Sequence, residues 1–242
     1  MGCVRGSGVL GGDGEMKVLI ACEYSGRVRD AFIALGYDAM SCDLLPTDQP
    51  GPHYQGSVLD VIGDGWDLMI AHPPCTYLTC SAEWAYGDGP YHQKVKEGTL
   101  VGAARRKARQ EAVEFVKALY NAPIARLAIE NPVGVLSREF REPDQFIQPY
   151  EYGEDGSKKT CLWLKGLPLL QPTRLYSPRL CKTADGRSYA FRWGNQTDSG
   201  QNKESPCADR WKIRSTTWQG WANAMADQWG GYISRTAVGM WR

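Results

Sequence analysis

The chain has 242 residues, of which 43% are hydrophobic and 23% charged, and its formal net charge is +1. This length suits one domain with a full core, or one domain with a small lobe, and the composition is that of a soluble globular protein. No apolar run is long enough to span a membrane, and we do not expect the glycine-rich start, Met1–Glu15, to be a secretory signal. We expect this start to be a disordered tail.

Short apolar segments alternate with helical segments in the first half of the chain. Four segments are apolar and bounded by polar residues, as buried strands are: Lys17–Cys22, Tyr37–Cys42, Asp67–Ala71 and Arg126–Ile129. Two segments carry apolar residues at helical spacing: Val28–Leu35, with Gly36 as its C-terminal cap, and Ala103–Tyr120. This alternation predicts parallel βαβ units, and therefore an α/β fold with a Rossmann-like, doubly wound, mostly parallel sheet.

After Gln148 the chain becomes rich in Gly, Pro, Trp, Arg and Ser. We expect two short strands, two long loops and a last helix: Cys161–Leu164 and Tyr189–Trp193, residues 168–188 and 194–209, and Trp218–Trp229. These changes divide the chain into a tail (1–15), a catalytic domain (16–150), a small recognition lobe (151–212) and a C-terminal segment (213–242) whose helix returns to the catalytic domain.

Charge is distributed unevenly along the chain. From Lys158 to the end there are 14 Lys and Arg against 5 Asp and Glu, whereas the preceding part has 14 against 22. A basic second half indicates contact with a polyanion, although a dipolar surface without a partner would give the same pattern. The eight cysteines form neither a disulfide framework nor a zinc motif. We therefore expect reduced thiols, no metal and a cytoplasmic protein.

The tripeptide Pro73–Pro74–Cys75 ends the apolar segment Asp67–Ala71 and presents a thiol directly after it. Proline cannot donate to a sheet ladder, so the strand must end here in a rigid loop, at the edge where open α/β sheets keep their chemistry. Glu130 follows another strand and would reach the same edge. A desolvated carboxyl group has a raised pKa and can protonate a ring nitrogen, which activates the ring for a thiolate. The alternatives are a small buried cysteine and a structural acid.

The turn after the first strand, Ala21–Gly26, is the second candidate site. Its small residues let a ligand approach the backbone and the start of the next helix. Asp43, at the end of the second strand, is placed to accept hydrogen bonds from ribose hydroxyls, and Asp60 offers a contact to an exocyclic amine. Two isolated acids could equally be caps.

These motifs stand in the order of those of the DNA cytosine-5 methyltransferases: Glu23–Gly26, Asp43, Asp60, His72–Cys75 and Glu130–Pro132. The chain most resembles the compact, phage-type branch of that family, from about Lys17 to Pro132. Two later segments look like the family's closing motifs: Arg214–Thr216 and Ala222–Ala226. The resemblance implies the class I S-adenosylmethionine-dependent methyltransferase fold. It also implies Cys75 as the nucleophile at cytosine C6 and Glu130 as the proton donor to N3.

The resemblance further implies the binding residues. S-adenosylmethionine would contact Glu23, Tyr24, Ser25, Gly26, Asp43, Leu44, Asp60, Val61 and Pro73, with Asp43 on its ribose and Asp60 on its adenine. DNA would contact Pro74, Asn131, Lys158, Lys159, Thr160 and Arg214, and Ser157–Thr160 would replace the family's arginine motif at cytosine O2.

The chain departs from the family pattern at several positions. Glu23–Gly26 replaces a richer glycine run, His72 replaces a small residue, Thr76 replaces a glutamine and Pro132 replaces a valine. The short recognition region suggests limited sequence specificity or a homodimer.

The resemblance thus predicts an enzyme that methylates C5 of a flipped cytosine in DNA, in the host cytoplasm if it is phage-encoded. Related alternatives are another donor group or a free nucleotide as substrate. An amino-group methyltransferase would need an aromatic residue where Cys75 stands. A catalytically idle DNA-binding homologue is a further alternative, which the presence of Cys75 and Glu130 disfavours.

Overall fold

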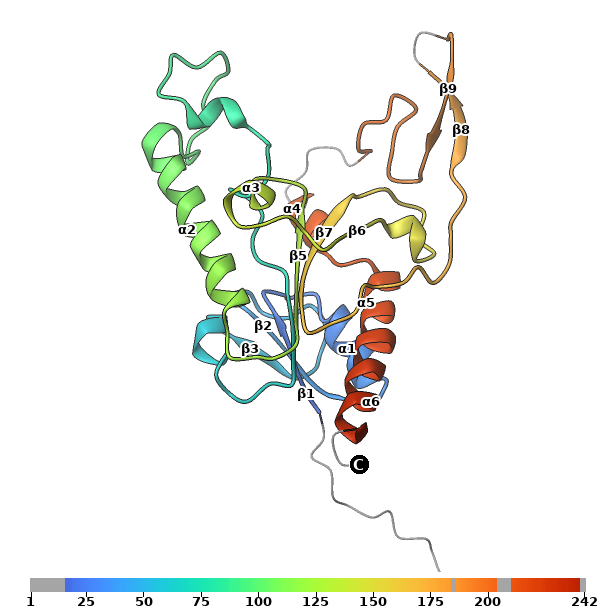
Figure 1. Cartoon of the computed structure of the whole chain (residues 1–242). Coiled ribbons are helices and arrows are strands. Elements are labelled where there is room, and N and C mark those ends of the chain that lie inside the picture. The colour runs from blue at the N-terminus through green and yellow to red at the C-terminus, as the bar shows by residue number, and fades with distance from the viewer. Residues whose placement is uncertain (1–15, 184–185, 204–209, 240–242) are drawn as a thin grey trace, which may run out of the picture.

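A mixed seven-stranded sheet forms the centre of the molecule (Figure 1). The computed structural model describes residues 16–183, 186–203 and 210–239. The sheet has the order β3-β2-β1-β4-β5-β7-β6, and its strands are β1 (Lys17–Ala21), β2 (Asp38–Asp43), β3 (His53–Gln55), β4 (Leu68–Ala71), β5 (Leu127–Pro132), β6 (Gln145–Ile147) and β7 (Thr160–Lys165). β7 runs antiparallel to both β5 and β6, and the other pairs are parallel. This confirms the predicted α/β class and is compatible with a Rossmann-like fold.

Helices cover both faces of the sheet. They are α1 (Arg27–Ile33), α2 (Gly102–Tyr120), α3 (Leu136–Glu139), α4 (Arg210–Ser215), α5 (Gln219–Met225) and α6 (Gly231–Gly239), with a π-helical turn, η4 (Ala226–Gly230), between the last two. Val18 and Ile20 of β1 pack with α1, α5 and η4, whereas Leu19 and Ala21 pack toward α2 on the other face. Because both faces are covered, β1 and β4 are continuous apolar runs rather than alternating ones.

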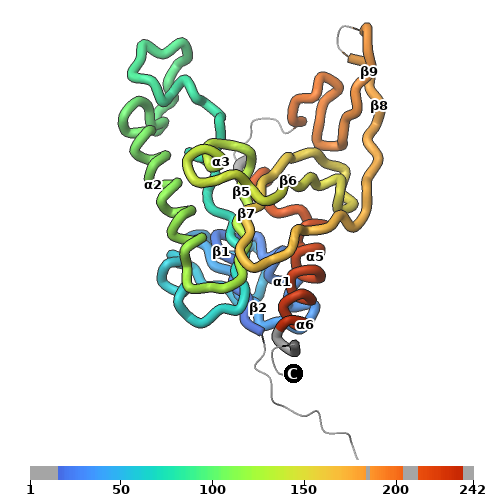
Figure 2. Tube along the Cα trace, viewed as in Figure 1, coloured from blue at the N-terminus to red at the C-terminus, as the bar shows by residue number. Residues whose placement is uncertain are grey.

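The basic second half contributes both to the sheet and to a separate hairpin. β7 belongs to the central sheet, although it falls inside the predicted lobe of residues 151–212. β8 (Arg179–Lys182) and β9 (Tyr189–Arg192) form their own two-stranded sheet. Figure 2 shows that this hairpin and the segment before α2 rise on opposite sides of the same end of the molecule.

Most predicted elements lie within two residues of their observed positions, and two predictions need correction. The loop expected over residues 168–188 contains β8. The last helix, expected to end at Trp229, continues through η4 into α6. β3 and β6 were not predicted. Among the helices of the described ranges, none combines the length and the apolar character that a bilayer span needs.

Candidate functional site

The candidate site lies at the carboxyl ends of β1 and β4. These strands are parallel neighbours, and the chain leaves them in opposite directions along the sheet, toward β2 and toward β5. Such a switch point leaves a crevice in which open α/β sheets bind their ligands. The turn after β1 begins at Cys22, and the loop after β4 begins at His72, whose N–H donates to the Ala21 carbonyl over 2.9 Å. The two predicted motifs are therefore adjacent.

The turn after β1 is stabilised by its own side chains. Cys22 has a positive φ of 57°, in the left-handed region that non-glycine residues rarely adopt. The buried Glu23 carboxylate accepts hydrogen bonds from the Ser25 hydroxyl and, over 3.1 Å, from the Gly26 N–H. Two predicted cofactor ligands, Glu23 and Ser25, thus bond to each other and shape the turn. The Tyr24 hydroxyl donates to the Lys212 carbonyl over 3.0 Å, which connects the turn to α4.

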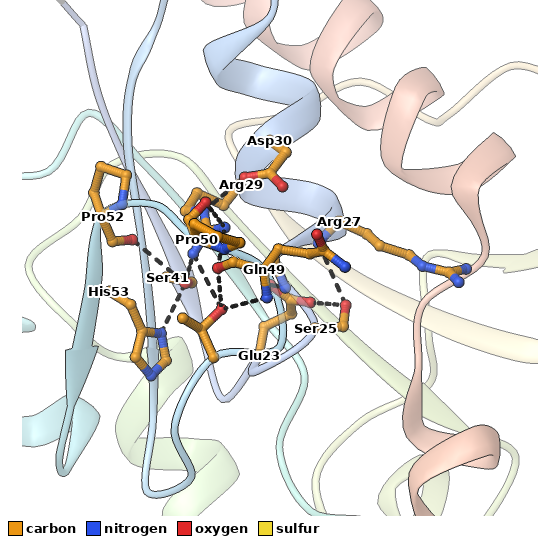
Figure 3. Close-up of polar contacts among 12 residues, drawn as sticks. Glu23, Ser25, Arg27, Arg29, Asp30, Ser41, Gln49, Pro50, Pro52 and His53 are labelled. Carbon is orange, nitrogen blue, oxygen red and sulfur yellow. Dashed lines mark hydrogen bonds and ion pairs between the residues drawn. The ribbon is translucent and has the colours of Figure 1, made fainter.

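Arg29 of α1 holds the segment that follows β2 (Figure 3). Its side chain is fully buried, and its guanidinium donates to the Gln49 and Pro50 carbonyls over 3.0 and 3.2 Å. It also donates to the Ser41 hydroxyl over 3.1 Å. Sequence reasoning missed Arg29, although an arginine three residues before the core residue Phe32, on the apolar side of a helix, was a usable signal.

The predicted contacts of the methyl donor's nucleoside lie beyond β2 and β3. Asp43 accepts from the Leu45 N–H over 2.9 Å, and burial raises its pKa. Asp60, in a short 3-10 helix, accepts from the Tyr54 hydroxyl over 3.3 Å. Burial and the charges of Asp43 and Asp60 raise the pKa of Cys42 to about 11, so both acids lie near the Cys42 thiol. Leu44 is 73% exposed, and Val61 is buried.

The loop after β4 presents Cys75 in a tight turn. Pro73 is buried, Pro74 is exposed, and Cys75 is half-buried. The Asn131 amide of β5 donates to the Pro73 carbonyl over 2.8 Å, so that the Glu-Asn motif holds the Pro-Pro-Cys loop directly. The Cys75 carbonyl accepts from the N–H groups of residues 78 and 79 over 3.0 and 3.1 Å.

Gly134 lets the next loop approach this turn. The Val135 N–H donates to the Leu78 carbonyl over 2.8 Å, and a Cβ at Gly134 would lie 2.0 Å from that carbonyl oxygen. The Cys75 loop therefore packs against the loop that follows Glu130.

The Glu130 side chain lies beside that of His72, which follows the neighbouring strand. Nδ1 of His72 lies 3.3 Å from Oε2 of Glu130, and the two side chains are 9% and 10% exposed. Sequence reasoning noted His72 only as a departure from the family pattern. The register Ala71↔Ile129 explains the contact, since His72 and Glu130 each follow one member of that pair.

The antiparallel β7 brings basic residues to the same edge. Its first residue, Thr160, pairs with Pro132, and Lys158 precedes it. The Lys158 ammonium donates to the Arg214 carbonyl over 3.2 Å. The exposed Lys159 instead places its ammonium 4.1 Å from the Phe146 ring centroid. Of the predicted DNA-binding cations, Lys158 and Arg214 lie close enough to Cys75 for their charges to act on its thiol, whereas Lys159 contacts Phe146.

The pKa shifts connect these groups. Burial raises the pKa of Cys75, the charge of Glu130 adds to the increase, and the charges of Lys158 and Arg214 oppose it. For Glu130 burial also acts to raise the pKa, but the His72 hydrogen bond and the charge of Lys158 outweigh it, and the pKa is lowered. The expectation of a raised Glu130 pKa is therefore wrong for this structure, because a desolvated carboxylate here has cationic and hydrogen-bonding partners.

Arg109 of α2 fixes the segment that continues from Cys75. Its guanidinium donates to the Tyr77 and Thr79 carbonyls over 2.9 and 3.2 Å and pairs with Glu83 over 2.7 Å. It also lies 3.4 Å from the centre of the Tyr86 ring. Arg109 therefore positions the loop that follows Cys75.

Within the described residues, no group of three or more His, Cys, Asp or Glu side chains could hold a metal ion. The arrangement provides a thiol, a carboxyl group, an imidazole and two cations around one point of the sheet edge. No protein-family model matches the chain, and no curated protein matches it.

Proposed function

We propose that this protein transfers a methyl group from S-adenosylmethionine to C5 of a cytosine in DNA. The observation that carries the proposal is the meeting of Cys75 and Glu130. β4 leads to the thiol, β5 carries the carboxyl group, and Glu130 is close enough for its charge to raise the pKa of Cys75. A nucleophile and an acid so placed can act on one pyrimidine ring.

The residues beyond β1, β2 and β3 fit S-adenosylmethionine by their chemistry. Asp43 would accept from ribose hydroxyls, Asp60 from the adenine amine, and the exposed Leu44 offers an apolar surface to the adenine ring. Gly26 has a φ of 78°, in the left-handed region, and a Cβ there would lie 2.9 Å from Cβ of Gln49, so this position of the turn favours glycine. When bound, S-adenosylmethionine supplies an electrophilic methyl group carried on a sulfonium.

Cys75 and Glu130 would act on a cytosine that has left the base stack. The Cys75 thiolate forms a bond to C6 while Glu130 gives a proton to N3, and the C5–C6 electron pair becomes nucleophilic at C5. Once C5 carries the methyl group, solvent water takes the C5 proton, the electrons of that C–H bond re-form the C5–C6 double bond, and the sulfur–C6 bond breaks with its electron pair on sulfur. Cys75 is thereby released as the thiolate with which it began, and the N3 proton returns to the Glu130 carboxylate.

This chemistry predicts opposing pH requirements. Cys75 must lose a proton, and its pKa is raised by burial, so its reactive form increases as pH rises. Glu130 must hold a proton, and its pKa is lowered, so its reactive form increases as pH falls. We therefore expect a bell-shaped pH profile for the methylation rate.

The basic second half supports a polynucleotide as the substrate. Its β8–β9 hairpin exposes the side chains of Lys182, Tyr189 and Phe191. Cations that contact phosphates and aromatic rings that contact bases are the usual components of a nucleic-acid surface.

DNA that contains 5-fluorocytosine tests the proposal. Fluorine replaces the C5 hydrogen, so there is no proton to remove in the last step and the enzyme stays bonded to the base. With S-adenosylmethionine the wild type should form a covalent protein–DNA adduct, seen on a denaturing gel. Cys75→Ser should bind S-adenosylmethionine and form no adduct, whereas Cys80→Ser, at an exposed thiol nearby, should behave as the wild type. An adduct formed by Cys75→Ser would contradict the assignment.

A further inference from the structure

His72 is placed at the candidate site by the sheet itself. Its N–H bonds to the end of β1, and its ring lies against Glu130 at the end of β5. Both side chains are at least nine-tenths buried. The chemistry proposed above gives roles to Cys75 and Glu130 and none to this imidazole.

Three polar atoms at this place are buried without a hydrogen-bond partner among the described residues: Nε2 of His72, Oε1 of Glu130 and Oδ1 of Asn131. Leaving a buried polar atom unpaired costs about 1–3 kcal/mol, so such a group is typical of a surface that meets a ligand. His72 uses one lone pair of Oε2 of Glu130, which leaves a second one there, and Oε1 has no hydrogen-bond partner among the described residues.

We propose that His72 is a positioning residue that determines base specificity: its Nδ1–H donates to Oε2 of Glu130 and so confines the carboxyl proton of Glu130 to Oε1. The proposal rests on the function proposed above. A carboxyl group in this form presents a donor at Oε1 and an acceptor at Oε2. The hydrogen bond from His72 therefore fixes the order of donor and acceptor, which the carboxyl group alone does not.

That order matches one pyrimidine and not the other. Cytosine presents an acceptor at N3 beside its N4 amine donor, whereas uracil and thymine present an N3–H donor beside the O4 acceptor. A carboxyl group whose proton could reside on either oxygen would suit both kinds of base. With the proton confined to Oε1, the Glu130 carboxyl group fits cytosine and opposes uracil.

Other groups around Glu130 affect its charge but do not distinguish its oxygens. Lys158 acts on Glu130 through its charge, and the Glu130 charge raises the pKa values of the Cys75 and Cys161 thiols. The Thr160 hydroxyl also lowers the Glu130 pKa, but it donates its proton to the Lys158 carbonyl over 3.0 Å. Since Oε1 has no hydrogen-bond partner among the described residues, the bond at Oε2 is the one that sets the two oxygens apart.

Two variants separate the hydrogen bond from the packing. His72→Leu removes the donor and keeps a side chain of similar size, and His72→Asn keeps an amide N–H near the place of Nδ1. The rate of covalent adduct formation is measured on two DNAs that differ only in a 5-fluorocytosine or a 5-fluorouracil at the target position. We expect the wild type and His72→Asn to prefer cytosine strongly, and the preference to fall at least about tenfold in His72→Leu. A structural role alone would slow both DNAs alike, so an unchanged ratio in His72→Leu would overturn the proposal.

A second measurement does not depend on methyl transfer. The Glu130 carboxyl carbon is followed by NMR across pH in protein with 13C-labelled glutamate, with Glu130→Gln to assign the signal. Burial raises the Glu130 pKa and the His72 bond is foremost among the influences that lower it. The pKa should therefore rise in His72→Leu and change less in His72→Asn. If the wild type forms an adduct with neither DNA, the proposed function fails, and the NMR titration alone decides whether His72 holds Glu130; an unchanged pKa in His72→Leu means that it does not.

Discussion

Replacing Arg29 with methionine should release the segment between β2 and β3 from α1. The guanidinium donates five hydrogen bonds, to Asp30, Ser41, Thr47, Gln49 and Pro50, and its side chain is fully buried. Hydrogen bonds to a charged group contribute about 1.5–3 kcal/mol each, but they are not additive, and water can reach the exposed acceptors once the segment moves. Methionine also removes a buried charge that is costly to desolvate. We therefore expect the free energy of unfolding to fall by about 3 kcal/mol, well below the sum of the bonds.

Urea denaturation followed by circular dichroism measures this loss. With a slope of roughly 2 kcal/mol per molar urea, the midpoint should move down by about 1.5 M. Arg27→Met is the matched control, because Arg27 lies two residues earlier in α1, is exposed, and donates to the Thr217 carbonyl over 3.0 Å. We expect it to change stability by less than about 1 kcal/mol.

The same two variants test the predicted cofactor region. Asp48, in the segment that Arg29 holds, donates its N–H to the Tyr24 carbonyl over 2.8 Å. Releasing the segment should therefore weaken S-adenosylmethionine binding, measured by calorimetry, in Arg29→Met and not in Arg27→Met. If Arg29→Met is as stable as Arg27→Met, the buried guanidinium does not organise this segment and the reasoning is refuted.

Two further substitutions test the loop that carries Cys75. Burial raises the pKa of Cys75 and the Lys158 charge opposes it, so Lys158→Met should raise that pKa further. Because the thiolate forms as pH rises, the pH curve for alkylation by iodoacetamide should then move upward, whereas Lys159→Met should leave it in place; faster alkylation of Lys158→Met would contradict the assignment. Gly134→Ala puts a Cβ 2.0 Å from a backbone carbonyl in the turn after Cys75, and should lower the free energy of unfolding by about 2 kcal/mol or more. Gly63→Ala is its control, because no heavy atom lies within 4 Å of the added Cβ. Equal thermal stability of the two variants would show that the turn after Cys75 accommodates a side chain at position 134 without cost.

The long elements were predictable because each carries a repeated pattern. β1 and β4 are apolar runs bounded by polar residues, and α2 repeats apolar positions over 19 residues. β3 and β6 have three residues each, which is too few for any periodicity to show. They become strands because a neighbouring strand offers backbone partners, and that information is not local.

The end of the last helix shows how a glycine can mislead. Gly230–Gly231 resembles a helix stop, yet the chain continues through η4 into α6. The structure explains Gly230 by packing, since a Cβ there would lie 2.6 Å from the Tyr37 ring. The helix thus needs glycine at this position in order to approach the start of β2.

The sequence was enough to predict that Cys75 and Glu130 lie near each other, but not the direction in which the Glu130 pKa is shifted. Cys75 and Glu130 each follow an apolar run in the sequence, and that alone placed both near one edge, although Glu130 lies within β5. The charge of Glu130 depends on a cross-strand register that brings His72 opposite it and on β7, which brings Lys158. Register and strand direction are properties of the folded sheet, so the sequence supported the wrong sign for the shift.

The reversed direction of β7 has a consequence for how the protein can vary. β7 begins at the edge of the sheet that holds Cys75 and Glu130 and ends at the opposite edge. The chain that follows β7 must therefore run back past the sheet to reach β8. That return path lies against the C-terminal helices, where the Trp229 indole donates to the Pro168 carbonyl over 2.9 Å and Gln171 and Gln228 exchange hydrogen bonds. The segment between β7 and the hairpin is thus held to the C-terminal helices by its own hydrogen bonds. Changes in the length or sequence of the hairpin can therefore alter the surface of the hairpin while the register between β4 and β5, which brings Cys75 near Glu130, stays fixed.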